Sequence, residues 1–439
     1  MSEVHRLGLR AIAARYADRS LTPLVLVEAL LARIAALDPT LCSFVLVDHD
    51  GALAAARAAT DRWASGDQRG PLDGIPVGIK DVIDVAGLPT RCHSATTSAA
   101  PATADAAIVT LVRDGGAIIL GKLATHEYAI GGPAFDLPFP PARNPWNLAH
   151  HPGGSSSGAG AAVAAGLVPL AIGTDTAGSV RNPASACGIV GLKPGRGLLP
   201  LGGIVPLAWS LDHVGLLTRS ADDMAIAAAA LGIPLDVGRA PRIGYVRHWH
   251  DTDMPADPDV AVALNRVAAT LGAVDITLPP LGHYNLANRV ILQAEGFAAH
   301  ESALRNRPAD LCSITRATLL PGAFTSAEML IDAHRLARRL TAATDAAFLE
   351  VDLLLTASSM TAPCRFDDPA EIARTYLMQA RSPFNVTGHP ALAMMAGVSA
   401  DGLPLSLQLA APMGGEGALL AAAARWEAAY DGPRHPPGY

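Results

Sequence analysis

Gly153-Gly154-Ser155-Ser156-Ser157-Gly158 is the stretch on which the fold prediction for this chain rests, and Asp175-Thr176-Ala177-Gly178-Ser179 follows it downstream. Between them, residues 159–173 form the longest apolar run, which reads as a buried helix leading into a strand. Serine becomes a useful nucleophile only when a nearby base can take its proton. The two segments therefore raise the question of which side chain could serve as that base.

The distribution of lysine supplies a candidate base. Three of the chain's 33 basic residues are lysines, namely Lys80, Lys122 and Lys193, and the others are arginines. Arginine stays protonated in proteins, whereas a buried lysine can lose its proton. A lysine retained in such a chain is a candidate for proton transfer; the alternative is codon bias with three chance survivors.

Bulk composition limits the class of protein. Half of the residues are apolar and 17% are charged, which predicts a well-packed globular chain. A net charge of −7 and a pI near 6.0 argue against a nucleic-acid surface. The five cysteines are scattered without ligand spacing, so we expect no disulfide framework and no metal site. With neither a secretory signal nor a membrane span evident, the sequence predicts a cytoplasmic protein that does not bind membranes.

Alternating strand and helix patterns predict an α/β architecture. The helices are expected at 22–37, 50–64, 104–115, 159–165 and 416–430, and the strands at 44–47, 75–85, 117–120, 351–356, 391–398 and 403–409. Asp401-Gly402 is a hairpin turn signal between the last two strands. No linker divides the chain, so we expect one domain over 1–439, with an N-terminal helical part (1–65), a core carrying the catalytic residues (71–222) and a C-terminal part (223–439) that adds strands and the substrate pocket.

Local motifs leave several alternatives. Gly154 to Gly158 matches Gly-x-Ser-x-Gly, which would make Ser156 a nucleophile, but the proline-rich residues 131–152 precede it where a strand is required. A phosphate loop would need Gly-Lys-Ser/Thr after the glycines. A helix-capping turn is the simplest structural interpretation. Cys187 fits a core position better than a reactive thiol. A serine–histidine pair would have to come from four scattered candidates: His126, His150, His151 and His213.

The full pattern is more specific. It comprises Gly78-Ile79-Lys80-Asp81, the serine- and glycine-rich stretch, and the run from Ser179 to Pro194. Further matching segments are 71–84, 121–122, 143–146, 401–404 and 407–409. Together they resemble the amidase signature family over nearly the whole chain. The resemblance implies an α/β amidase signature fold, with a large mixed central β-sheet covered by helices on both faces.

The resemblance also implies a Ser-cisSer-Lys triad. Ser179 would be the nucleophile, Ser155 the bridging serine after a cis peptide bond, and Lys80 the base. The apolar neighbours of Lys80 in its strand would lower its pKa by desolvation. The resemblance further implies an oxyanion hole built from the backbone N–H groups of Thr176, Ala177, Gly178 and Ser179. We interpret Asp175, Arg181 and Ser156 as supporting residues, and the substrate-lining candidates are Tyr128, Gly131, Gly132, Phe135 and Phe139.

Several expectations concern the surroundings of the triad. Ala177 and Ser157 stand where the family often has glycine, and Ala177 would be strained if its φ were positive. Lys122 is expected to be structural, and Lys193 to donate to carbonyls near the site. Trp146 is either a pocket or a core residue. An apolar wall of the substrate pocket is expected from Ala323, Phe324 and residues 311–320.

The predicted function is a cofactor-free serine hydrolase that cleaves amide C–N bonds through an acyl-enzyme. Small carbamates, anilides and aryl esters are further candidate substrates, and the apolar wall favours neutral or aryl ones. We expect a monomer or homodimer. The alternatives are the glutamine-hydrolysing component of a tRNA-dependent amidotransferase, which works in a complex, and a non-catalytic binding protein.

Overall fold

A mixed sheet of eleven strands forms the centre of the molecule. The computed structural model describes residues 4–236 and 238–439. The strand order is β1-β3-β2-β4-β6-β5-β10-β11-β9-β7-β8. The strands are β1 (Phe44–Val47), β2 (Pro76–Lys80), β3 (Ile118–Leu123), β4 (Leu170–Asp175), β5 (Val190–Lys193), β6 (His213–Thr218), β7 (Ile243–Tyr245), β8 (Val274–Asp275), β9 (Leu353–Ala357), β10 (Ala391–Val398) and β11 (Pro404–Ala410).

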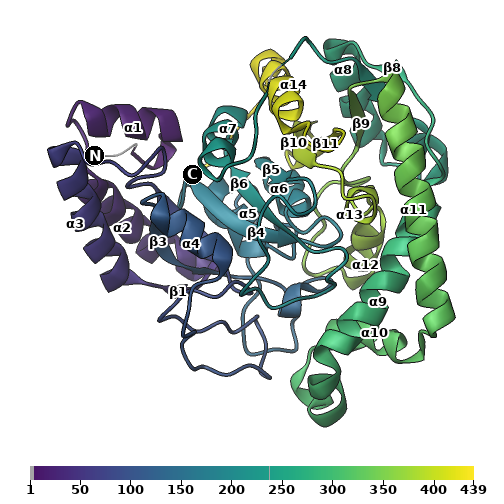
Figure 1. The fold of residues 1–439 in the computed structure, drawn as a ribbon, viewed down its shortest axis with the longest axis horizontal. Coiled ribbons are helices and arrows are strands. Elements are labelled where there is room, and N and C mark those ends of the chain that lie inside the picture. Colours follow the sequence, from purple (N-terminus) through teal and green to yellow (C-terminus); the bar gives the residue numbers. More distant parts are fainter. Residues whose placement is uncertain (1–3, 237) are drawn as a thin grey trace.

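Helices pack around this sheet (Figure 1). The long helices α9 and α11 lie against each other at the opposite end of the molecule from α2 and α3 (Figure 1). The helices are α1 (Leu9–Ala17), α2 (Pro23–Leu41), α3 (His49–Ser65), α4 (Ala107–Asp114), α5 (Ser157–Ala164), α6 (Arg181–Cys187), α7 (Ala221–Ala230), α8 (Pro258–Leu271), α9 (Leu281–Asn306), α10 (Ser313–Leu319), α11 (Ala327–Glu350), α12 (Pro369–Leu377), α13 (Pro383–Val386) and α14 (Glu416–Ala429). The predicted α/β fold with a large mixed sheet is confirmed.

Most of the elements predicted from the sequence lie within a few residues of observed ones, although helices such as α8, α9 and α11 had no predicted bounds. Helix α2 begins at Pro23 because Thr22 caps it, its hydroxyl accepting the Val25 N–H at 3.2 Å. The predicted hairpin is β10 and β11, with Gly402 at φ 75° in its turn. The strand expected over 75–85 is shorter, because β2 ends at Lys80 and the chain then turns. None of the described helices combines the length and apolar character needed to cross a bilayer.

The middle of the sheet brings the signature segments together. Strand β2 pairs in parallel with both β3 and β4, so their carboxyl ends lie at one edge of the sheet. All residues of these three strands are buried, as expected for parallel strands covered by helices. Lys80 ends β2 and Asp175 ends β4, and α5 and α6 begin beside that edge. The fold thus gathers three separate sequence segments at one place.

Candidate active site

Lys80 and Ser155 form the best-defined polar contact of the site. Lys80 Nζ donates to Ser155 Oγ and to Thr174 Oγ1, both at 2.8 Å. The lysine side chain is completely buried, and this burial lowers its pKa to about 7, against the opposing influence of the Asp175 and Asp212 charges. Ser155 follows a cis peptide bond after Gly154. At neutral pH a large fraction of Lys80 is therefore unprotonated and able to accept a proton from Ser155.

Lys80 and its neighbour Asp81 have separate partners. The Asp81 carboxylate pairs with Lys122 at 2.9 Å, and both side chains are fully buried. Consecutive residues at the end of a strand point to opposite faces, as the sequence predicted for this pair. Lys80 is thus left without a paired carboxylate among the described residues, whereas Lys122 is held in a buried ion pair. Lys193 Nζ donates to the Pro194 carbonyl at 2.9 Å.

Asp175 organises the loop that carries Ser179. Its carboxylate accepts the backbone N–H groups of Gly178 at 2.8 Å and Val180 at 3.1 Å. It also pairs with Arg181 at 2.8 Å, with both side chains fully buried. Burial opposes the ionisation of Asp175, but the Arg181 charge and the hydrogen bonds hold its pKa below its usual value. The loop between β4 and α6 is therefore tied to a fixed buried anion.

The backbone donors of this loop are not equivalent. The N–H of Gly178 is taken by Asp175, whereas those of Thr176, Ala177 and Ser179 meet no acceptor among the described residues. The loop is further held through Thr176, whose hydroxyl donates to Asp212 at 2.6 Å. Of the four predicted oxyanion-hole donors, the N–H groups of Thr176, Ala177 and Ser179 thus stay unpaired among the described residues, whereas that of Gly178 does not.

Ala177 does not carry the strain that the sequence suggested for it. The positive φ lies one residue later, at Gly178, with φ 114°. Glycine adopts this conformation without a steric penalty, whereas residues with a Cβ do not. Alanine is therefore tolerated at position 177, and glycine is required at position 178.

Ser179 itself is half-buried and lies next to the serine-rich turn. Its carbonyl accepts the Ser156 N–H at 3.2 Å. Its hydroxyl makes no hydrogen bond with any described residue, and none joins it to Ser155. The structure thus joins Lys80 to Ser155, and the Ser179 hydroxyl has no hydrogen-bond partner among the described residues.

Ser156 has a different setting from its neighbours. It is completely buried, and its hydroxyl donates to the Thr174 carbonyl at 3.3 Å. It directly precedes α5, and no strand leads into it, so the context of a hydrolase elbow is absent here. Ser157 opens α5 with its hydroxyl 3.5 Å from the Ala124 carbonyl. Both hydroxyls thus face backbone carbonyls, and the Ser156 side chain does not cap α5.

Histidine and cysteine do not supply a base or nucleophile at these serines. Among the described residues, none of the four candidate histidines is hydrogen-bonded to the hydroxyl of Ser155, Ser156 or Ser179. The Cys187 thiol is buried against the Pro152 carbonyl, and burial raises its pKa. Within the same described part of the chain, no cluster of three or more His, Cys, Asp or Glu side chains is arranged to hold a metal ion.

Comparison with known proteins agrees with this arrangement of residues. A sequence model of the amidase family matches residues 25–232 and 236–420. The chain belongs to the amidase family. Among curated amidase relatives, a glutamyl-tRNA(Gln) amidotransferase subunit of Acidothermus cellulolyticus is 34% identical, over 98% of this chain and 95% of its own length. The corresponding subunit of Anaeromyxobacter sp. (strain K) is 40% identical over 63% of this chain and 61% of its own.

Solved amidase structures share the whole fold. The native peptide amidase of Stenotrophomonas maltophilia has a TM-score of 0.84 at 28% identity, covering 99% of this chain and 98% of that one. A 6-aminohexanoate cyclic dimer hydrolase complexed with substrate has a TM-score of 0.86 at 26% identity, covering 99% of both chains. An inhibitor-bound vestigial complex linked to the origins of an s-triazine catabolic enzyme has a TM-score of 0.90 at 29% identity, covering 96% and 98%.

The aromatic residues predicted to line the substrate pocket have three separate surroundings. Tyr128 donates to or accepts from Thr96 at 2.6 Å, and its ring lies 4.3 Å from that of His300. Phe139 is half-buried against His93, at 5.1 Å between ring centroids. Phe135 is 59% exposed. The aromatic residues of this loop are thus spread over separate contacts and do not form one wall.

A polar aromatic group that sequence reasoning missed lies beside the serine turn. The His126 ring covers Gly154, where an added Cβ would lie 2.0 Å from its Cε1. His126 Nδ1 donates to the Gly131 carbonyl at 2.7 Å, and burial lowers the pKa of His126 to about 3. His151 lies 5.3 Å from that ring and 3.1 Å from the Tyr376 hydroxyl. These residues are distant in sequence, so only the fold reveals the group.

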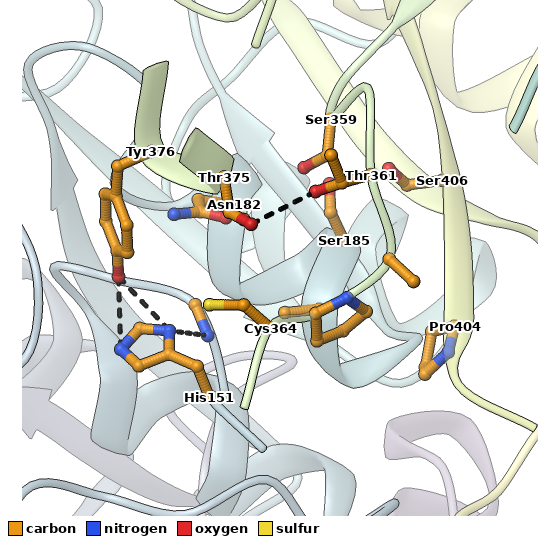
Figure 2. Close-up of a pocket in the computed structure, with 14 residues that line it drawn as sticks. His151, Asn182, Ser185, Ser359, Thr361, Cys364, Thr375, Tyr376, Pro404 and Ser406 are labelled. Atoms are coloured by element: carbon orange, nitrogen blue, oxygen red, sulfur yellow. Dashed lines mark hydrogen bonds between the residues drawn. The ribbon is translucent and has the colours of Figure 1, made fainter. Parts of the chain in front are cut away.

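Figure 2 shows the small cavity, of about 20 Å³, that His151 and Tyr376 help to line. Asn182 and Ser185 of α6 and Gly153 of the serine- and glycine-rich stretch also line it. Gly132 packs close by, since a Cβ there would lie 3.7 Å from the Tyr376 ring. The cavity therefore adjoins the two signature segments.

The prediction that Ala323 and Phe324 form an apolar wall of the substrate pocket is wrong. Phe324 is 86% exposed, and Ala323 is also exposed, because both lie in the turn between α10 and α11. Trp146 packs against the core and donates to the Cys187 carbonyl at 2.8 Å. Ala323 and Phe324 therefore give no support to the expectation of neutral or aryl substrates.

Proposed function

We propose that this chain hydrolyses the C–N bond of small amides through an acyl-enzyme formed on Ser179, with carbamates, anilides and aryl esters as further candidate substrates. The observation that carries the proposal is the 2.8 Å contact between Ser155 Oγ and a buried Lys80 with a pKa of about 7. A lysine of this kind can act as a general base at neutral pH. Membership of the amidase family supports the same reaction class.

The first half of the reaction forms the acyl-enzyme. Ser179 Oγ attacks the amide carbon while its proton passes to Ser155 Oγ, and the Ser155 proton passes to Lys80 Nζ. The negative oxygen of the tetrahedral intermediate is stabilised by the free N–H groups of the loop, each worth about 10²–10³ in rate. As the C–N bond breaks, the proton returns from Lys80 through Ser155 to the departing nitrogen, so the leaving group is a neutral amine.

The second half regenerates the enzyme. A water molecule attacks the acyl carbon, and Ser155 with Lys80 accepts its proton by the same route. Collapse of the second intermediate breaks the ester bond and returns the proton to Ser179 Oγ. The products are a carboxylic acid and an amine, and no external reactant other than water is consumed.

Active-site labelling tests the assignment of the nucleophile. A fluorophosphonate probe followed by peptide mass spectrometry should place the adduct on Ser179, and Ser179→Ala should abolish both labelling and hydrolysis. Ser156→Ala serves as the control, because Ser156 faces the Thr174 carbonyl and should still permit labelling. An adduct on Ser156 in the wild-type protein would overturn the triad.

The amidotransferase alternative is supported by the curated relatives that bear the name of a glutamyl-tRNA(Gln) amidotransferase subunit. A chain of that kind would release ammonia from glutamine and would work with further subunits. Assaying ammonia release from glutamine by the isolated chain, beside a panel of amides, carbamates and anilides, separates the two functions. Turnover of glutamine alone would favour the alternative. Monomeric or homodimeric assembly stays a prediction.

A further inference from the structure

A buried arginine lies directly against the nucleophile loop. Arg381, just before α13, is 2% exposed. A Cβ added to Gly178 would lie 2.5 Å from Arg381 Cβ and 2.6 Å from its Nε. The Arg381 side chain, including Nε of its guanidinium group, therefore lies beside the residue that precedes Ser179.

The charge of Arg381 has no carboxylate partner among the described residues. Its Nη1 donates to the Ser358 carbonyl at 3.0 Å and to Ser359 Oγ at 2.6 Å. The other two nitrogens of the group, Nε and Nη2, have no hydrogen-bond partner among the described residues. Nε is buried, whereas Nη2 is not fully shielded from solvent. Burial lowers the pKa of Arg381 to about 9, which still leaves it protonated at neutral pH. A buried cation without a counter-ion is costly, so its retention calls for an anionic ligand.

Arg181, a second buried arginine of this site, has a full set of partners within the protein. Arg181 pairs with Asp175 and also donates to Asn385 Oδ1 at 2.6 Å and to Gln408 Oε1 at 2.7 Å. Asp175 is thereby already paired with Arg181. Arg381 has no comparable set of partners, and its unpaired Nε is the donor that lies against Gly178 of the nucleophile loop.

We propose that Arg381 binds a carboxylate of the substrate, so that the preferred substrates are amides carrying an anionic group a few bonds from the scissile carbonyl. The inference rests on the proposed hydrolysis at Ser179. The planar guanidinium matches a carboxylate in charge and in the geometry of its donors. It narrows the proposed amides to anionic ones, in place of the neutral or aryl substrates expected from the sequence, because Ala323 and Phe324 of the expected apolar wall lie at the surface.

Matched pairs of substrates test the proposal directly. Succinamate and butanamide have the same length and differ in a terminal carboxylate or methyl group, as do malonamate and propanamide. Wild-type protein should show the higher kcat/KM on the anionic member of at least one pair. Arg381→Gln should lower the ratio of anionic to neutral kcat/KM by about 10- to 100-fold, the usual contribution of a charged hydrogen bond. Arg374→Gln, which removes an exposed arginine on α12, should leave the ratio unchanged.

A binding measurement separates this proposal from the proposed reaction. In the Ser179→Ala background, calorimetry should detect succinate or malonate, and Arg381→Gln should remove that binding. Carboxylate binding without any amide hydrolysis would refute the reaction and leave Arg381 as an anion site. Equal kcat/KM on both members of every pair in wild-type protein would overturn the role of Arg381, whether or not the variant folds. If Arg381→Gln unfolds in a thermal melt, Arg381→Lys keeps the charge but loses the planar pair of donors, and it should lower the same ratio.

Discussion

Replacing Lys80 by arginine separates its charge from its ability to give up a proton. With a pKa of about 7, roughly half of the Lys80 side chains are neutral at pH 7. A guanidinium of pKa above 12 is neutral in only about one molecule in 10⁵ at the same pH. General-base catalysis contributes about 10²–10⁴ in rate. Lys80→Arg should therefore lower kcat/KM by about 10²–10⁴, nearly as much as Lys80→Ala.

The assay is steady-state hydrolysis of a chromogenic anilide or ester, with thermal melting to follow folding. Lys122→Arg is the matched control, because Lys122 is equally buried but holds the Asp81 carboxylate, a task that arginine can also perform. Its kcat/KM should stay within about tenfold of wild type, since only packing changes. Wild-type activity in a folded Lys80→Arg protein would refute proton transfer to Lys80.

Three further predictions test the same site. Because Lys80 must be neutral, kcat/KM should rise with pH and level off above about pH 7, as a pH profile of wild type will show. Gly178→Ala should reduce activity by at least about 10²-fold, because φ 114° and the contact with Arg381 both exclude a Cβ, and a shifted loop would misplace the neighbouring Ser179 N–H, one oxyanion donor being worth about that much. Gly197→Ala, at φ 83° with open space around it, is the control in kinetics and melting. Ser155→Ala should lower kcat by about 10²–10⁴, whereas Ser156→Ala should cost only about 1 kcal/mol in urea unfolding, and the reverse order would contradict the assigned roles.

Local sequence signals were sufficient for much of the fold. The Thr22-Pro23 start of α2 and the Asp401-Gly402 turn depend on residues that are adjacent in the chain. The end of β2 at Lys80 was missed because apolar residues continue through Val85, and burial alone does not distinguish a strand from the turn that follows it. The pairing of β2 with β4 joins segments about 90 residues apart, and periodicity along the chain could not predict it.

The candidate site also combines residues that sequence motifs indicate with a residue that only the structure reveals. Lys80, Ser155 and Ser179 lie in motifs that can be read along the chain, although the catalytic roles of these three residues stay proposals. Arg381 lies in the C-terminal part, where the sequence holds no motif, and it is one arginine among many. Its proposed role depends on its contact with Gly178 and on the lack of a hydrogen-bond partner for its Nε. Such information arises only when distant segments are packed together.

The three lysines of the chain show why partner and burial must be considered together. All three side chains are fully buried, but Arg181 and Arg381 are buried as well, so burial alone does not explain why lysine stands at these positions. Burial lowers the pKa of both Lys80 and Lys193, so a low pKa alone does not identify the base. Lys193 donates to a backbone carbonyl, which has no proton to give. Lys122 contacts the Thr90 hydroxyl but is also paired with the Asp81 carboxylate. Lys80 has no carboxylate partner among the described residues, and one of the two hydroxyls it contacts belongs to Ser155 beside the nucleophile loop. Lys80 is therefore the lysine of the three that is placed to take a proton from the serine turn.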